Sequence, residues 1–108
     1  MEEVILDTKA LAWEELRKFP GEGEAKVLRE EPEGGAKSMI VKLPAGGKIF
    51  PHTHLAEVQH YVLEGEYESD GKAFPAGTYR LLPKNADLPP ISTKTGVVVL
   101  MIYDPITR

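Results

Sequence analysis

Hydrophobic residues along the chain fall in short runs that recur about every ten residues, separated by glycine, proline, asparagine or aspartate. This spacing is typical of an antiparallel sandwich or barrel. Examples are the runs Met39 to Leu43, Tyr61 to Leu63 and Thr78 to Leu82. The run Val97 to Tyr103 is hydrophobic on both faces of a strand, so we expect it to be a central strand. The pattern therefore predicts an all-β fold.

Turn signals mark where the chain reverses between these runs. Asp70-Gly71 predicts a tight hairpin, because both residue types tolerate a positive φ angle. Pro75-Ala76-Gly77 predicts the next turn, and Pro89-Pro90 excludes a central strand at that point. Only Thr8 to Phe19 has helical spacing. An extended segment in which Trp13 packs over the barrel explains it equally well, and the sequence leaves both interpretations open.

Length and cysteine content narrow the class of protein. A chain of 108 residues is enough for one domain, so we expect 1–108 to form a single unit with 1–25 as an N-terminal arm packed on the barrel. There is no cysteine, which excludes disulfides, thiolate zinc sites and cysteine nucleophiles. Any metal must be held by imidazole, carboxylate or amide groups.

Charge and hydropathy set expectations about partners and location. The 13 basic and 17 acidic side chains give a net charge of −4, which leaves no basic face for phosphates, so we expect no nucleic-acid partner. The longest apolar run, Val97 to Ile102, is too short to cross a bilayer. The first residues are acidic where a signal peptide would be basic. We therefore expect a cytoplasmic protein that has no membrane partner.

All three histidines lie close together, at His52, His54 and His60. Alternate side chains of an extended segment share a face, so His52 and His54 present both imidazoles to one point. Neutral imidazole ligates Fe, Mn, Ni, Cu and Zn. His60 is the third candidate ligand, with Val58 on its own face of the next strand and Gln59 on the opposite face. The rival interpretation is a solvated or hydrogen-bonded histidine pair that binds no metal.

The segment from Gly46 to Gly65 resembles the first signature of the cupin superfamily, in which glycine, His-x-His, glutamate and a second glycine follow at set intervals. Phe74 to Tyr79, leading to Pro83-Lys84-Asn85, approximates the second signature. Over nearly its whole length the chain is also similar to small cupins such as the cupin domain of ChrR-type anti-sigma factors. The resemblance implies a double-stranded β-helix, the cupin or jelly-roll barrel.

The resemblance also implies a metal site, from which this chain departs. Cupins hold one divalent metal by two histidines and a glutamate of the first signature and a histidine of the second. His52 and His54 match the first two ligands. The positions that match the glutamate and the last histidine hold Val58 and Leu88, both apolar. This departure leaves three possibilities open.

One possibility is a rebuilt site in which His60 supplies a third imidazole and Gln59 or Glu57 completes the set through a register shift or β-bulge. Three imidazoles are a workable set for a mononuclear non-haem centre, and the resemblance implies that such cupins cleave carbon–carbon bonds of diketones or hydroxyketones. The expected ligands are His52, His54, Gln59 and His60. The expected cofactor is a divalent transition metal (Fe, Mn, Ni or Zn), and the expected activity is that of a dioxygenase acting on a small organic molecule.

The other two possibilities are a metal-free cupin that binds a small molecule, with His60 as base and Tyr79 as acid, and a sensing module in which metal occupancy alters stability. Asp87 is a rival carboxylate ligand but fits an exposed turn better. Arg80 fits a surface ion pair as well as it fits an anionic substrate. Because cupins commonly pair through an outer sheet face, we expect a homodimer with Val97 to Ile102 in the buried face.

Overall fold

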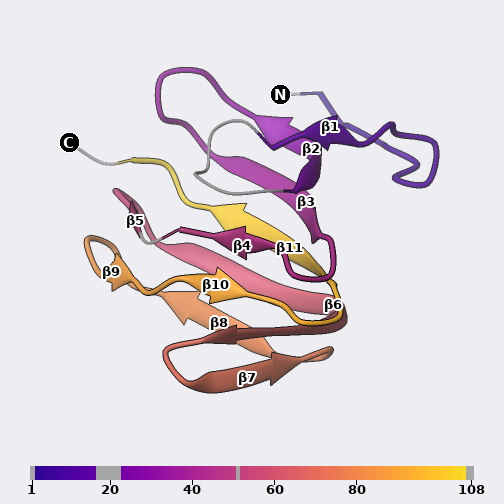
Figure 1. Cartoon of the computed structure of the whole chain (residues 1–108). Coiled ribbons are helices and arrows are strands. Elements are labelled where there is room, and N and C mark those ends of the chain that lie inside the picture. Colours follow the sequence, from indigo (N-terminus) through magenta and orange to yellow (C-terminus); the bar gives the residue numbers. More distant parts are fainter. Residues whose placement is uncertain (1, 17–22, 51, 107–108) are drawn as a thin grey trace.

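The computed structural model describes residues 2–16, 23–50 and 52–106. Within these ranges every regular element is a β-strand, which confirms the all-β prediction (Figure 1). The strands are β1 (Glu14–Glu15), β2 (Glu24–Glu30), β3 (Lys37–Leu43), β4 (Lys48–Ile49), β5 (His52–Thr53), β6 (Val58–Ser69), β7 (Lys72–Pro75), β8 (Tyr79–Leu82), β9 (Asp87–Leu88), β10 (Ile91–Ser92) and β11 (Val97–Tyr103). The described residues contain no helix that is long and apolar enough to cross a membrane.

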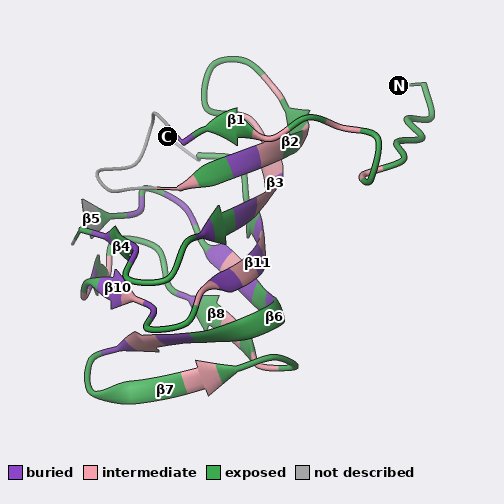
Figure 2. Ribbon diagram, turned by 45° about the vertical axis from the view of Figure 1, so that its right-hand side comes forward, coloured by how far each residue is buried: buried purple, intermediate pink, exposed green. Residues whose placement is uncertain are grey.

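The strands form a curled antiparallel sheet whose hub is β6. The order along the sheet is β1-β2-β3-β11-β6-β10-β4, with β7 and β8 also paired to β6. A separate short ladder joins β5 to β9. β11 lies between β3 and β6, which confirms that the strand hydrophobic on both faces is central. Figures 1 and 2 show β4 and β10 lying across the curl from β3 and β11.

The predicted turn at Asp70-Gly71 is present. These two residues have φ angles of +52° and +74° and join β6 to β7. Both angles lie in the left-handed region, which a tight hairpin requires. The tight hairpin predicted from this dipeptide is therefore confirmed.

A β-bulge divides β6 into two halves that pair with different strands. Its first half pairs with β8 and β11, and its second half pairs with β7 and β10. The ladder with β11 shifts register between Val98 and Val99, which leaves Leu63 of β6 as an extra residue. Buried side chains therefore occupy even-numbered positions up to Val62 and odd-numbered positions from Tyr67 onward.

Gly65 lies two residues after the bulge, where β6 passes close to the turn before β11. Its φ angle is +72°, in the left-handed region that favours glycine. A Cβ atom at this position would collide with the backbone carbonyl oxygen of Gly96, in the turn before β11. The glycine that ends the first signature thus has a physical role here, because no other residue satisfies both conditions.

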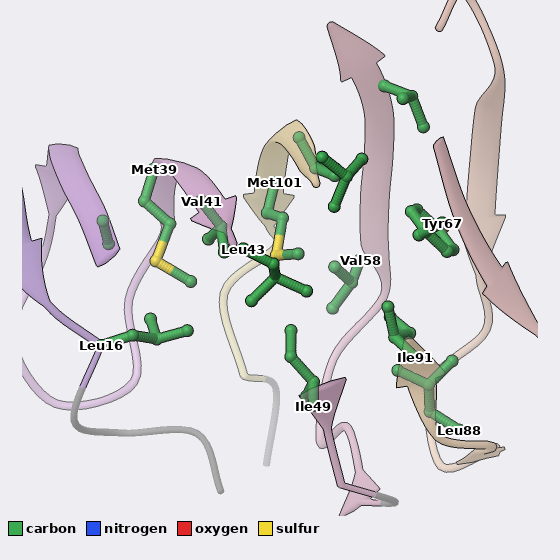
Figure 3. Packing of buried hydrophobic residues seen from close by; sticks show 14 of the residues in the cluster. Leu16, Met39, Val41, Leu43, Ile49, Val58, Tyr67, Leu88, Ile91 and Met101 are labelled. Carbon is green, nitrogen blue, oxygen red and sulfur yellow. The ribbon is translucent and has the colours of Figure 1, made fainter. Parts of the chain in front are cut away.

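The hydrophobic core fills the inside of the curl. Val58 and Val99, on the neighbouring strands β6 and β11, expose 0% and 2% of their surface. Ile49, Leu88 and Ile91 close the core from the short strands β4, β9 and β10, and Figure 3 shows them lying together beside Val58. Burial of an aliphatic side chain of this size contributes about 1.5 to 3 kcal/mol. Buried side chains alternate with more exposed ones along β3, β11 and the first half of β6 (Figure 2).

Residues 13–15 of the N-terminal segment contact the sheet, whereas residues 2–7 are exposed. β1 pairs with β2, and the ring centre of Trp13 lies 4.6 Å from Nζ of Lys26 and 5.4 Å from Nζ of Lys42. Cation–π contacts of this kind favour an extended path over the sheet. The described part of Thr8 to Phe19 contains a turn at residues 8–10 and the strand β1 but no helix, so the interpretation with Trp13 packed over the sheet is the correct one there, and residues 17–19 lie outside the described ranges.

Candidate metal and ligand site

Two of the three histidines face the same small cavity inside the curl. His60 points inward from β6 and exposes 1% of its surface, and His54, which follows β5, exposes 8%. The cavity has a volume of about 10 Å³, room for about one water molecule or ion. Its other lining residues are mainly apolar: Ile49, Leu88, Ile91, Met101 and Tyr103. The two imidazoles are therefore the nitrogen donors in the described lining.

His60 belongs to a buried hydrogen-bonded chain. Its Nδ1 lies 3.0 Å from Oη of Tyr67, and Nη1 of Arg80 donates to the same oxygen at 3.0 Å. The guanidinium carbon of Arg80 lies 4.2 Å from the ring centre of Phe74. Arg80 thus points into the barrel and contacts a hydroxyl and aromatic rings, where the sequence allowed a surface ion pair. Because Nδ1 of His60 faces Tyr67, the ring nitrogen that Tyr67 does not engage is Nε2.

Burial controls the protonation of the two tyrosines near the cavity. Burial raises the pKa of Tyr67 above its ordinary value, and the hydrogen bond and positive charge of Arg80 offset this increase only in part. Burial also raises the pKa of Tyr103. Both phenols therefore keep their protons near neutral pH and can act as hydrogen-bond donors as well as acceptors.

The bulge in β6 brings Tyr67 to the face of His60. The two residues are seven positions apart, and an odd separation places side chains on opposite faces of a regular strand. The extra residue Leu63 shifts the alternation, so both side chains point inward. Sequence reasoning missed Tyr67 for this reason. The signal that could have found it is Gly65, since a glycine within a strand pattern often marks a bulge.

The structure does not bring Gln59 to the histidines. The side chain of Gln59 lies on the outer face of β6, where Oη of Tyr79 donates to its Oε1 at 2.8 Å. A register shift at this point would be needed to turn Gln59 inward, but the bulge lies further along the strand at Leu63. Tyr79 is 55% exposed on the same outer face. The interpretation of Tyr79 as the acid partner of His60 is therefore wrong, and Tyr67 occupies that position.

The remaining ligand candidates lie around β5 and β9. The backbone of His52 pairs with Leu88, and its side chain lies outside what the structure describes. Leu88 and Val58, which match the other two ligand positions, expose 5% and 0%. Asp87 is exposed and accepts a hydrogen bond from Oγ1 of Thr53 at 2.7 Å, as expected for a surface aspartate. Among the described side chains, no three His, Cys, Asp or Glu residues gather at one point.

A larger pocket opens beside the inner cavity and shares a wall with it. Its volume is about 570 Å³, within the range of sites for small organic ligands. His54 and Tyr103 line both spaces, and their rings meet edge to face with centres 5.8 Å apart. Val58 also faces the pocket. His54 therefore lies between an ion-sized space and a ligand-sized one.

The far side of the pocket is formed by the loop between β2 and β3 and by the C-terminal segment. Nζ of Lys37 pairs with a carboxylate oxygen of Glu30 at 3.1 Å. The backbone N–H of Ile106 donates to the carbonyl oxygen of Gly34 at 2.8 Å, which ties the two stretches together. Sequence reasoning did not find this pocket, because its walls come from stretches far apart in the chain.

The described lining of the inner cavity offers two imidazole donors to a transition-metal ion, fewer than a metal site needs. Imidazole nitrogen is a good ligand for Fe, Mn, Ni and Zn, and a ligating histidine usually bonds a second group through its other nitrogen. Tyr67 is such a group for His60. The described side chains provide two of the required donors, His54 and His60. His52 is the remaining histidine that would complete a three-imidazole site.

Comparison with known proteins decides the family. The model of the ChrR cupin-like domain matches residues 1–107. The chain belongs to the ChrR cupin-like domain family. The fold of this cupin is the double-stranded β-helix, as the signatures predicted. No curated protein matches it.

Solved cupin structures share its fold at low sequence identity. An acetylacetone dioxygenase from Acinetobacter johnsonii is 18% identical, with a TM-score of 0.77 over 95% of this chain and 73% of that one. An RmlC-like cupin from Shewanella frigidimarina NCIMB 400 is 19% identical, with a TM-score of 0.77 over 96% and 92% of the two chains. At such identities the likeness establishes the fold alone.

The anti-sigma protein ChrR is also similar in structure. In the complex of Rhodobacter sphaeroides SigE with ChrR, the matching chain is 19% identical to this cupin, with a TM-score of 0.71. The match covers 91% of this chain and 52% of that one. This cupin therefore corresponds to about half of the matching chain.

Proposed function

We propose that this cupin is a metal-dependent dioxygenase that acts on a small organic molecule, with His52, His54 and His60 as ligands of one divalent Fe, Mn, Ni or Zn ion. The observation that carries the proposal is the arrangement of His54 and His60 around an ion-sized cavity that shares a wall with a pocket of about 570 Å³. A metal bound there would supply Lewis-acid and redox chemistry to a substrate and dioxygen. Gln59 is not included, because its side chain bonds Tyr79 on the outer face.

The chain's own residues would position a substrate and keep water away from it. Val58 is at the position where the family has a carboxylate ligand. This apolar side chain lies on the same inner face of β6 as His60 and also lines the larger pocket. Tyr103 packs edge-on against the ring of His54 and limits its orientation. A substrate in the larger pocket would therefore meet the imidazole of His54 next to apolar surface.

Thermal unfolding with added metals tests the metal site. A ligand that binds the folded state stabilises it, by about 2.7 kcal/mol at a concentration 100 times its dissociation constant. We expect at least one of Fe²⁺, Mn²⁺, Ni²⁺ and Zn²⁺ to raise the Tm of untagged protein, and His54→Ala and His60→Ala to abolish the increase. Gln59→Ala, on the opposite face of the same strand, is the control and should keep it. Failure of all four metals to stabilise the wild type contradicts the proposal.

Turnover is tested separately by oxygen consumption. Metal-loaded protein is offered a panel of diketones, hydroxyketones and flavonols, and His60→Ala is the inactive reference. Metal-dependent oxygen uptake with one of these substrates supports a dioxygenase. Metal binding without oxygen uptake across the panel supports the sensing module instead.

A metal-free binding module is the second candidate. It is favoured by the two apolar residues, Val58 and Leu88, at ligand positions of the family and by the bond of His60 to Tyr67. In this case the larger pocket would bind its ligand in chelator-treated protein. Leu55→Trp, a substitution at an exposed pocket residue, should then block binding while leaving the Tm close to that of the wild type.

We also propose that two copies pair through the outer face of β6, β8 and β11. Large hydrophobic side chains are 37% to 55% exposed there: Tyr61, Leu63, Tyr79, Leu81 and Ile102. They are adjacent across the ladders, since Tyr61 faces Tyr79 and Gln59 separates Ile102 from Leu81. Monomers rarely expose a large apolar patch. Sedimentation should show a dimer that Leu81→Glu converts to a monomer, and a monomeric wild type contradicts this proposal.

A further inference from the structure

The N-terminal tail, residues 2–6, makes no hydrogen bond or ion pair within the described part of the chain. Its three apolar side chains, Val4, Ile5 and Leu6, expose 71%, 82% and 42% of their surface. Figure 2 shows the tail projecting away from the strands. Consecutive exposed apolar side chains beside unpaired backbone groups are typical of a segment that binds another surface.

A turn at the base of the tail holds it away from its own sheet. The backbone N–H of Ala10 donates to the carbonyl oxygen of Asp7 at 3.0 Å, and the N–H of Lys9 donates to Oδ1 of Asp7 at 3.0 Å. Nζ of Lys26, on β2, donates to the carbonyl oxygen of Thr8 at 2.6 Å, which fixes the turn to the sheet. The chain therefore joins the sheet after the turn, and the tail before the turn stays clear of it (Figure 2).

The tail starts from the outer face of the sheet, at the end formed by β2 and β3. Lys42 of β3 is exposed between the buried Val41 and Leu43, so its side chain lies on the outer face. Trp13, which follows the turn, lies over Lys26 and Lys42. The chain's own segment thus contacts the β2–β3 end of this face. The exposed apolar side chains lie toward the other end, on β11, β6 and β8.

β8 is a free edge at that other end. It pairs with β6, and no other described strand pairs with it. Its outward side chains, Tyr79 and Leu81, expose 55% and 54% of their surface. An extended segment adds to such an edge through backbone hydrogen bonds and covers its side chains. The tail fits this role, because its backbone is unpaired and Val4 and Ile5 have a strong strand preference.

A second copy of the chain brings a tail to this edge. When two outer faces pair with the two-fold axis parallel to the strands, the β2–β3 end of one copy lies opposite the β8 end of the other. Each tail then starts beside β8 of the other copy. Five extended residues span about 16 Å, and the four residues of β8 span about 13 Å. The tail is therefore long enough to cover the whole strand.

We propose that the tail of each copy adds as a strand to the free edge of β8 in the other copy. Val4, Ile5 and Leu6 leave water in this arrangement and cover Tyr79 and Leu81. The proposal rests on the pairing of outer faces proposed above. It goes further in naming the segment that holds the two copies together.

Sedimentation of an Ile5→Asp variant tests the contribution of the tail. We expect its dimer dissociation constant to rise about 10- to 100-fold, because the burial of an aliphatic side chain is lost. Its Tm as a monomer should not change, since Ile5 is 82% exposed. Leu55→Asp, at a 60% exposed residue of the larger pocket, is the control and should keep the wild-type constant. An unchanged constant in Ile5→Asp overturns the role of the tail and leaves the pairing of outer faces intact, whereas a monomeric wild type overturns both.

Cross-linking tests which copy the tail contacts. The chain has no cysteine, so Ile5→Cys/Leu81→Cys carries only the two introduced thiols. We expect a short bismaleimide to join position 5 of one copy to position 81 of the other, seen as a covalent dimer whose joined peptides are identified by mass spectrometry. Ile5→Cys/Leu55→Cys is the control and should give no link between positions 5 and 55. A link between 5 and 81 within one chain, or no link between them, overturns the proposal.

Hydrogen exchange tests the backbone pairing itself. Amides of the tail should exchange about 10-fold or more slowly in the wild-type dimer than in Leu81→Glu, which is expected to be monomeric. Tail amides that exchange equally fast in both proteins overturn the addition of the tail to β8, even where Ile5→Asp weakens the dimer.

Discussion

The inner and outer faces of the sheet around β6 carry similar hydrogen bonds in opposite surroundings. On the inner face Tyr67 bonds His60, and the two expose 0% and 1% of their surface. On the outer face Tyr79 bonds Gln59 and is 55% exposed. If the bond between Tyr79 and Gln59 breaks, both groups can bond to water, whereas water does not reach the buried Tyr67 and His60. The two hydrogen bonds are of similar type, so the difference in burial decides that the bond of Tyr67 contributes more to stability than the bond of Tyr79.

The bulge in β6 is what creates this difference. With regular alternation from His60 onward, position 67 would fall on the outer face and the histidine would lack its partner. The register shift at Leu63 places Tyr67 inside instead. The contact between Tyr67 and His60 therefore depends on a β-bulge at Leu63, a residue outside the site.

The largest expected effect comes from a side chain at Gly65, next to the bulge in β6. Gly65→Ala places a Cβ against the carbonyl oxygen of Gly96 and strains a backbone at φ +72°, so we expect a loss of about 2 to 4 kcal/mol in the free energy of unfolding. Gly46→Ala is the control. Gly46 has φ +82° and no atom within 4 Å of the point that a Cβ would occupy, so it should lose only about 1 kcal/mol. Urea unfolding measures both, and equal losses contradict the importance of the close approach to Gly96.

The next largest effect compares the two hydroxyls directly. Tyr67→Phe leaves a buried imidazole nitrogen and a guanidinium N–H without their partner, which should cost about 1 to 3 kcal/mol. Tyr79→Phe removes an exposed hydroxyl and should change the free energy of unfolding by less than about 0.5 kcal/mol. Urea unfolding of both variants measures the difference. Losses of the same size would show that the inner bond does not depend on its burial.

The parts of the molecule that the sequence predicts are those that depend on local patterns. The strand Val97–Tyr103 is central because it is apolar on both faces, and Asp70-Gly71 forms the hairpin that its conformational preferences favour. The inward orientation of His60 beside Val58 follows from simple alternation, and both residues are buried as expected. Each of these features is decided within a few residues of the chain.

The parts that could not be predicted depend on tertiary contacts. Tyr67 joins His60 only because a bulge intervenes, and a regular alternation count places it on the wrong face. Trp13 has neighbours with helical spacing, but its contacts with Lys26 and Lys42 accompany an extended path. The larger pocket brings together the loop after β2, the segment around His54 and the end of β11, and no local pattern links these stretches.

The smallest expected effect is a loss of stability at high pH that follows from the burial of Tyr103. Burial raises the pKa of Tyr103, which lines the cavity next to His54. A tyrosine in the unfolded chain loses its proton near pH 10, while the folded protein keeps Tyr103 neutral to higher pH. Above about pH 10 the unfolded state therefore binds fewer protons, and the free energy of unfolding falls by up to about 1.4 kcal/mol per pH unit from this residue. Below that pH the residue contributes no slope.

Tyr103→Phe should remove this part of the pH dependence. Urea unfolding of the wild type and the variant at about pH 8, 10 and 11 gives the two slopes. We expect the slopes to agree below about pH 9, because Tyr103 is neutral in both states there, and the wild type to lose stability more steeply above about pH 10. Equal slopes above pH 10 would mean that the folded protein ionises Tyr103 as readily as the unfolded chain does. The inner wall beside His54 would then admit charge and water, and its contrast with the outer face would disappear.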